Sequence, residues 1–121
     1  MSDIRESITY VSQNELLFND TIRNNIILGR EVSEIDYLNI CKILHIDDIV
    51  KDSIQGYDYV LEENGINLSG GQRQRIILAR SLLKNSNIIM IDEGFNQIDI
   101  TLEREILQDI FTYYHNKTFI I

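Results

Sequence analysis

A short polar stretch, Ser69-Gly70-Gly71-Gln72, has the residue types of an anion-binding helix start. Ser69 is a favourable N-cap, and Gln72 three residues later completes a capping box, so a helix is predicted to begin here. Because Gly70 and Gly71 carry no side chains, a phosphate can approach unpaired backbone N–H groups at the positive end of the helix dipole. Each part alone also has a plain structural explanation, since Ser-Gly-Gly is often a flexible turn and S-x-x-Q is often only a cap.

Two acidic residues form a second candidate site. Asp92 and Glu93 follow Ile88-Ile89-Met90-Ile91, a short apolar run that favours a parallel strand buried on both faces. Such a strand delivers the acidic pair to the edge of a sheet. Gln13 follows the β-rich run Ile8 to Val11, at the carboxyl end of a strand, where open α/β sheets bind ligands. Taken alone, an Asp-Glu pair is more often a solvated turn, and a glutamine after a strand is more often a loop residue.

The composition is that of a soluble globular protein. Of the 121 residues, 44% are hydrophobic and 25% are charged, which argues against disorder and allows one modest domain or part of a larger one. The net charge of -8 argues against nonspecific nucleic-acid binding, which needs a surplus of Lys and Arg. We find no signal peptide and no apolar run of about 18 residues that would span a membrane. The single cysteine, Cys41, excludes an internal disulfide and is expected to be buried.

Hydrophobic periodicity predicts the elements that carry these residues. Strands are expected at 8–11, 88–91 and 118–121, and helices after a cap at Asn19 or Asp20 up to about Gly29, after a cap at Ser33, and over about 70–84 and 102–113. Residues 47–65 are irregular and are interpreted as part of a small helical and loop subdomain. The last strand stops without a cap or a polar tail, so we expect the chain to be a fragment of a longer protein.

The basic residues of the predicted helix are interpreted as structural. Arg73, Arg75 and Arg80 are expected on a solvated or carboxylate-paired helix face, with a functional role as the alternative. His45 and His115 lie near the predicted ends of helices and are expected to be ordinary helix-end or surface residues.

In chain order, the stretches described above resemble the ATPase domain of ABC transporters. Residues 68–72 read LSGGQ, the signature sequence of that family, and residues 88–93 look like its Walker B strand with the glutamate that follows. The other matches are the strand that leads into the Q-loop at 8–13, the exporter-type X-loop at 63–65, the D-loop aspartate Asp99 and the strand before the switch histidine at 117–121.

The resemblance implies the fold class. It is α/β, a partial P-loop NTPase core of about three parallel strands with an inserted α-helical subdomain. Residues 1–18 and 86–121 would form the core lobe, and residues 19–85 would form the helical subdomain that ends in the signature helix. The Walker B strand, 88–91, is expected between the other two strands. The last strand is then an uncovered edge that favours self-association.

The resemblance also implies ATP and Mg²⁺ as cofactors. Asp92 would hold Mg²⁺, usually through water, and Glu93 would orient or deprotonate the attacking water as the general base. Gln13 would contribute a neutral amide to Mg²⁺ and to the water. The nucleotide-binding residues would be Leu68, Ser69, Gly70, Gly71, Gln72, Gln13 and Asp99.

Partners are implied as well. The signature stretch would meet the γ-phosphate held by a second copy, in a head-to-tail pair of ATPase domains. The transmembrane domains of the transporter would contact the Gln13 loop and the Glu63 loop, although Glu63 has a simple loop role as a near-equal alternative. The parent protein would therefore work at the cytoplasmic face of the cell membrane, without nucleic acid.

The sequence departs from the family pattern at three places. The glycine-rich Walker A loop, G-x-x-x-x-G-K-[ST], does not occur in the 121 residues, nor does the switch histidine, for which His115 is not a substitute. Residues 94–98 read GFNQI instead of the usual small residues, and Phe95 puts the tight subunit contact there in doubt. Without the main phosphate cradle, we expect the fragment itself to be inactive.

Two alternatives to an exporter ATPase remain open. A non-transport ABC ATPase of the DNA-repair or chromosome type shares LSGGQ, but its helical subdomain is normally interrupted by long insertions, which the path from Gln13 to Ser69 lacks. A regulatory domain that has kept the motif without hydrolysis is the other alternative, suggested by the unusual loop at 94–98. The sequence does not indicate a transported substrate.

Overall fold

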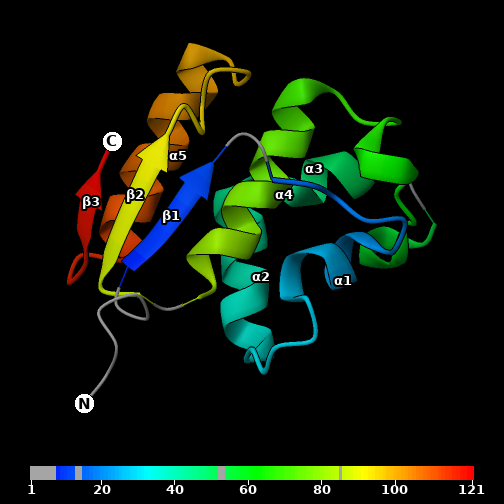
Figure 1. Ribbon diagram of the computed structural model, residues 1–121, viewed down its shortest axis with the longest axis horizontal. Coiled ribbons are helices and arrows are strands. Elements are labelled where there is room, and N and C mark those ends of the chain that lie inside the picture. The colour runs from blue at the N-terminus through cyan, green and yellow to red at the C-terminus, as the bar shows by residue number, and fades with distance from the viewer. Residues whose placement is uncertain (1–7, 13–14, 52–53, 85) are drawn as a thin grey trace.

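A computed structural model of the chain describes residues 8–12, 15–51, 54–84 and 86–121. Figure 1 shows three strands along one side of the molecule and the helices beside them. In chain order the elements are β1 (Ile8–Ser12), α1 (Ile22–Ile27), α2 (Glu34–Ile43), α3 (Ile46–Val50), the 3₁₀ turns η2 (Gly56–Asp58) and η3 (Glu63–Gly65), α4 (Gly70–Leu82), β2 (Ile88–Asp92), α5 (Ile100–Tyr113) and β3 (Thr118–Ile120).

The three strands form a parallel sheet in the order β1-β2-β3. Ile8 lies opposite Ile88 and Ser12 opposite Asp92, while Met90 lies opposite Ile120 on the other side. The strand that carries the acidic pair is therefore the central one, as predicted. The α/β fold class and the helical insertion between β1 and β2 are confirmed.

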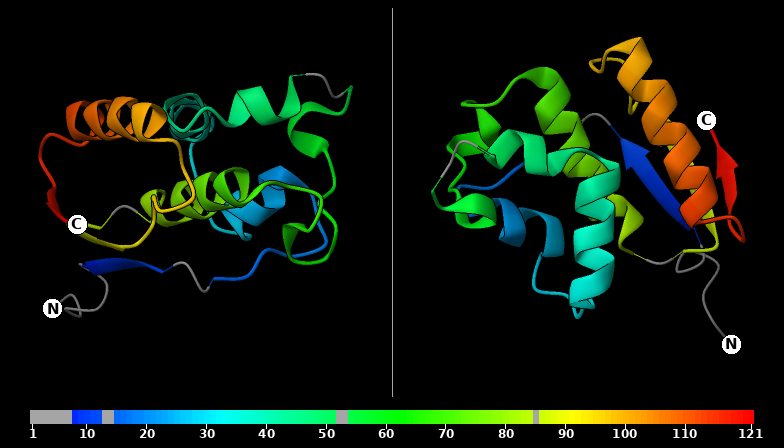
Figure 2. Two further views of the ribbon diagram at one scale, coloured as in Figure 1. Left: turned by 90° about the horizontal axis from the view of Figure 1, so that it is seen from above. Right: turned by 180° about the vertical axis from the view of Figure 1, so that it is seen from behind.

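The helices cover only one face of this sheet (Figure 2, left). Along β2, Ile89 and Ile91 are buried, whereas Ile88 and Met90 are half-buried. On β1, Tyr10 is 49% exposed. The expectation of a strand buried on both faces is therefore wrong for the described residues. Because successive side chains of a strand point to opposite faces, only every second residue reaches the helices.

Short polar side chains fix the starts of the first two helices. Thr21, rather than Asn19 or Asp20, caps α1, and its hydroxyl accepts the Asn24 N–H at 3.0 Å. Asp20 instead accepts hydrogen bonds from the Thr21 N–H and from the Asn24 amide, so it supports the cap from outside the helix. Ser33 caps α2 as predicted, accepting the Asp36 N–H at 3.1 Å.

Most of the core lies between the helices of the insertion. Tyr37, Ile40 and Cys41 of α2 are fully buried, so the prediction for the cysteine is confirmed. They belong to one apolar cluster with Ile22 and Ile26 of α1. The same cluster continues through α4 to the covered face of the sheet and to α5, so the insertion and the sheet share one core.

Candidate functional site

The start of α4 is built as the sequence predicts. The Ser69 hydroxyl accepts the Gln72 N–H at 3.1 Å, and the Gln72 side-chain oxygen accepts the Ser69 N–H at 3.0 Å. This reciprocal pair is a complete capping box. The first helical N–H groups, those of Gly70 and Gly71, have no intrahelical acceptor, and Ser69 and Gly70 are exposed. The turn is therefore chemically suited to an anion.

The two glycines of this turn also serve a second purpose, which the sequence does not reveal. A Cβ on Gly71 would lie 2.8 Å from the backbone oxygen of Gln97, and one on Gly70 would lie 2.7 Å from the Gln97 side-chain oxygen. Both contacts are shorter than ordinary van der Waals separations. The glycines thus allow the loop that follows β2 to pack directly against the helix start.

Gln74 joins the same loop from the second turn of α4. Its buried side chain donates to the Glu93 carbonyl oxygen at 3.1 Å and to Asn96 Oδ1, and it accepts the Gln97 N–H at 2.9 Å. Both amide hydrogens and the amide oxygen are thereby used. Gln74 thus links residues 69–72, the signature turn, to residues 93–97, the acidic loop that follows β2. Sequence reasoning did not single out this residue.

Asp92 ends β2 beside the end of β1, and a tyrosine holds its carboxylate. The Tyr10 hydroxyl donates to Asp92 Oδ2 at 2.7 Å. This hydrogen bond to the carboxylate raises the pKa of Tyr10. Tyr10 was not predicted as a site residue, although strand register contains the signal. Residue 10 pairs with Met90, so its side chain is on the same face as Asp92 and diagonal to it.

Glu93 adopts a left-handed backbone conformation. Its φ of 57° lies in a region that residues with a Cβ rarely occupy. Such a conformation costs about 1 kcal/mol for a residue other than glycine. The Glu93 side chain is exposed, while its carbonyl is fixed by Gln74. Glu93 is thus presented to solvent by a turn that the surrounding contacts impose.

The donor set around Asp92 fits a magnesium ion that is held largely by water and phosphate. In the described part of the chain, no group of three or more His, Cys, Asp or Glu residues converges as a metal site. Mg²⁺ commonly uses only one or two protein carboxylates and keeps several waters. The exposed Asp92 carboxylate has lone pairs beyond the one that Tyr10 engages. Gln13, the other predicted ligand, lies outside the described residues.

Three further predicted positions have visible structural roles. Asp99 caps α5 by accepting the Leu102 N–H at 3.4 Å. Leu68 is half-buried against the core cluster. Phe95, the atypical residue of the loop after β2, is 5% exposed and points into the core. Its large side chain therefore fills the interior of this chain.

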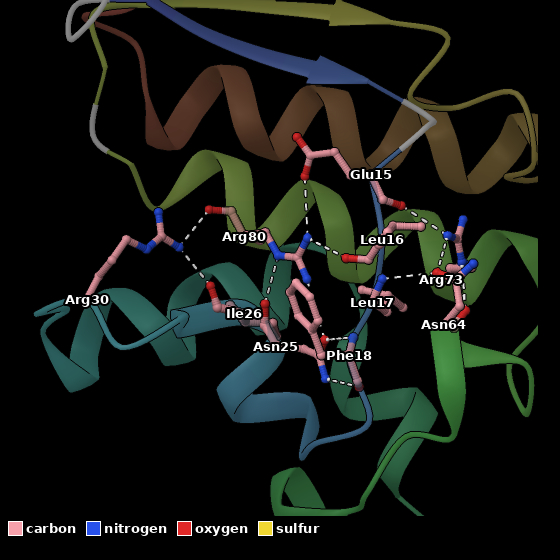
Figure 3. A network of polar contacts seen from close by, with 10 residues as sticks. All are labelled: Glu15, Leu16, Leu17, Phe18, Asn25, Ile26, Arg30, Asn64, Arg73 and Arg80. Atoms are coloured by element: carbon pink, nitrogen blue, oxygen red, sulfur yellow. Dashed lines mark hydrogen bonds and ion pairs between the residues drawn. The ribbon is translucent and has the colours of Figure 1, made fainter.

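The prediction of a solvated or carboxylate-paired arginine face on α4 holds in part: Arg80 pairs with the Glu15 carboxylate, but neither Arg75 nor Arg80 is solvated. Arg80 is 4% exposed and its guanidinium donates to the carbonyls of Asn25, at 2.8 Å, and Leu16, at 2.9 Å (Figure 3). Its contact with the Glu15 carboxylate is longer, at 3.5 Å. Burial lowers the pKa of Arg80, and Glu15 partly offsets this. Arg75 likewise donates to the His45 carbonyl at 2.9 Å.

Arg73 and Asn64 complete this network at the other end. Arg73 donates to the Glu15 carbonyl at 3.0 Å and to Asn64 Oδ1 at 2.7 Å, and Asn64 Oδ1 also accepts the Leu17 N–H at 3.1 Å (Figure 3). Asn64 has a φ of 52°, a left-handed conformation that asparagine tolerates better than most residues. The segment just after Gln13 and the turn that carries Glu63 are thus bound to the same helix.

The fold, the capped turn at 69–72 and the pair Asp92 and Glu93 are together those of part of an ABC-type ATPase domain. Comparison with known proteins agrees. The family model described as ABC transporter matches residues 1–96. The chain belongs to this family.

Its relatives include a flippase and another ABC transporter protein. The chain is 39% identical, over its whole length, to an ATP-dependent lipid A-core flippase of Pseudoalteromonas translucida, and 40% identical, over 98% of its length, to the uncharacterized ABC transporter ATP-binding protein YfiB of Bacillus subtilis. Each alignment covers 21% of the relative, so the chain spans about a fifth of the curated relatives it matches.

A solved structure shows the same fold. A bacterial Atm1-family ABC exporter with ATP bound superposes with a TM-score of 0.86 at 36% identity, covering 97% of this chain and 21% of that one. None of the helices described for this chain is long and apolar enough to cross a membrane.

Proposed function

We propose that these residues are part of the ATP-binding and hydrolysing subunit that drives an ABC exporter. The observation that supports this best is the packing of the capped signature turn, 69–72, against the loop that presents Glu93. An anion site and a carboxylate next to a magnesium-type aspartate are the parts that phosphoryl transfer requires. The relatives named as ATP-dependent flippases and as an exporter support the transport role.

Within that function, Asp92 would hold Mg²⁺ through water, and Glu93 would take a proton from the attacking water. Bound Mg²⁺ supplies charge neutralisation on the phosphates. Tyr10 orients the Asp92 carboxylate by its hydrogen bond, and Gln74 fixes the main chain of Glu93. Gln13 would add an amide ligand from the end of β1.

The partners would be a second ATPase domain and the transmembrane domains. Residues 68–72 and Asp99 would meet the nucleotide held by the second copy. The Gln13 loop and the exposed Glu63 would contact the transmembrane domains, and the protein would then work at the cytoplasmic face of the membrane. The hydrogen bonds of Arg73 to Glu15 and Asn64 tie both contact regions to the signature helix and support this assignment.

The 121 residues by themselves would not hydrolyse ATP. They contain no G-x-x-x-x-G-K-[ST] sequence, so the backbone cradle and the lysine that hold the β- and γ-phosphates are not among them. We expect no measurable turnover and, at best, millimolar nucleotide binding. Submicromolar ATP binding to the 121-residue chain, measured by calorimetry, would contradict this.

The decisive experiment measures ATP hydrolysis by the full-length protein and its Glu93→Gln variant. The variant should lose at least about 100-fold in turnover, because general-base catalysis contributes on that order, and should still pair in the presence of ATP. Glu31→Gln, the same change at an exposed position, is the matched control. Normal turnover in Glu93→Gln would exclude Glu93 as the base. A wild-type protein without ATPase activity would favour a regulatory domain instead.

A further inference from the structure

Gln74 is the buried polar side chain that links the signature turn to the acidic loop. It is 6% exposed and lies in α4 two residues after Gln72, the last residue of the capping box. A buried amide is costly unless its hydrogen bonds are made, and here the bonds go to a single loop, residues 93–97. A side chain needed only for packing would not have to be polar.

The bonds of Gln74 act on the main chain on either side of the loop's buried Phe95. At one end Gln74 donates to the Glu93 carbonyl, and at the other it accepts the Gln97 N–H. The orientation of the Glu93 carbonyl is coupled to the left-handed φ of that residue, which local preference alone would not maintain. Gln74 therefore helps to set the direction in which the Glu93 side chain leaves the backbone.

The helix start cannot move toward this loop without displacing it. Gly71 leaves room for no more than a hydrogen atom between α4 and the Gln97 carbonyl, since a Cβ there would be 2.8 Å from that oxygen. One helical turn then connects Ser69 to Arg73 through a backbone hydrogen bond of 2.9 Å. A shift of the turn on contact with phosphate must be accompanied by the loop, or the Gln74 bonds must break.

We propose that Gln74 is a positioning residue that couples the phosphate-binding turn, 69–72, to the orientation of Glu93. This inference rests on the proposed ATPase function. If the turn meets the nucleotide of a second copy, Gln74 connects nucleotide binding at that site to the orientation of Glu93 in its own chain.

The test is Gln74→Met in the full-length protein, a change that keeps the length of the side chain and removes every hydrogen bond. We expect kcat for ATP hydrolysis to fall about 10- to 100-fold, as for other small misplacements of a catalytic group. KM for ATP should stay within about 3-fold, and ATP-dependent pairing should persist, because binding is not the step affected. Gln108→Met, the same change at an exposed position of α5, is the control.

Gln74→Glu separates the hydrogen bonds from simple packing. Glutamate can still accept the Gln97 N–H but cannot donate to the Glu93 carbonyl, so kcat should fall here too. Persistence of ATP-dependent pairing shows that a variant is folded, and Gln74→Glu decides the question if Gln74→Met does not fold.

Three results would overturn the proposal. Wild-type kcat in a folded Gln74→Met or Gln74→Glu variant would show that the bonds do not position Glu93. A loss of pairing together with a large rise in KM would assign Gln74 to the binding turn instead. An inactive wild-type protein would refute the ATPase function itself, so the two failures are distinguishable.

Discussion

The helical insertion and the sheet of this chain differ in how far their side chains are shielded from solvent. In the insertion, Tyr37 and Ile40 are fully buried, and the guanidinium of Arg80 is enclosed with its partners. In the sheet, Ile89 is 1% exposed, but Ile120, on the other face, is 49% exposed. The difference shows that the described chain is stabilised mainly by packing among the helices and against the sheet face that they cover. One face of the sheet contributes little.

The largest expected effect on stability is in the helical insertion. Arg80→Met should lower the free energy of unfolding by about 4 kcal/mol, because it leaves the buried carbonyl of Asn25 and the partly buried carbonyl of Leu16 without their donor. Urea denaturation of the 121-residue chain measures the change. Arg104→Met on the exposed side of α5 is the control and should be nearly neutral. A loss below about 1 kcal/mol for Arg80→Met would show that the network is dispensable.

Two neighbours on β2 test the comparison within one strand. Ile89→Ala should cost about 3 kcal/mol, since it creates a cavity under the helices. Met90→Ala should cost about 1 kcal/mol or less, because Met90 is only half-buried on the uncovered face. Equal losses in thermal or urea unfolding would mean that both faces are packed, and would remove the contrast drawn here.

The two glycines of the signature turn form a second matched pair. Gly71→Ala should destabilise the chain by about 1–2 kcal/mol, because the new methyl group would meet the Gln97 backbone oxygen. In Gly70→Ala the obstacle is the flexible Gln97 side chain, so the gain in helix propensity should leave stability nearly unchanged. Unfolding midpoints of both variants provide the measurement. The reverse ranking would contradict the close approach of loop and helix.

The smallest effect on stability is expected at the edge strand. Ile120→Lys should change the free energy of unfolding by less than about 0.5 kcal/mol, since the side chain is exposed. It should nevertheless reduce self-association of the 121-residue chain, because a charged residue on an edge strand opposes pairing. Sedimentation velocity of both forms tests this. A wild-type chain that is already a monodisperse monomer would refute the edge-strand prediction made from the sequence.

Features that depend on neighbouring residues were predictable from the sequence. The capping box of Ser69 and Gln72 and the cap of Ser33 each join residues three apart, so their spacing carries the information. The order of the strands came from resemblance to a family and is confirmed. Whether the predicted residues bind nucleotide and metal stays a prediction.

Features that join distant residues were not predictable. Arg80 looks like a surface residue because arginine is rarely buried, and its partners Leu16 and Asn25 lie more than 50 positions away. The bond between Tyr10 and Asp92 spans 82 positions. The second role of Gly71 depends on a loop that periodicity does not place. In each case the missing information is the tertiary packing.

The backbone of Glu93 has a consequence for how this residue can change. At a φ of 57°, glycine would relieve the local strain, and asparagine would tolerate it better than glutamate does. Neither can accept a proton from water as a carboxylate does. A random search for greater stability would therefore favour replacements at position 93 that remove the proposed base. With Glu93 as the proposed base, glutamate at this position would trade stability for activity.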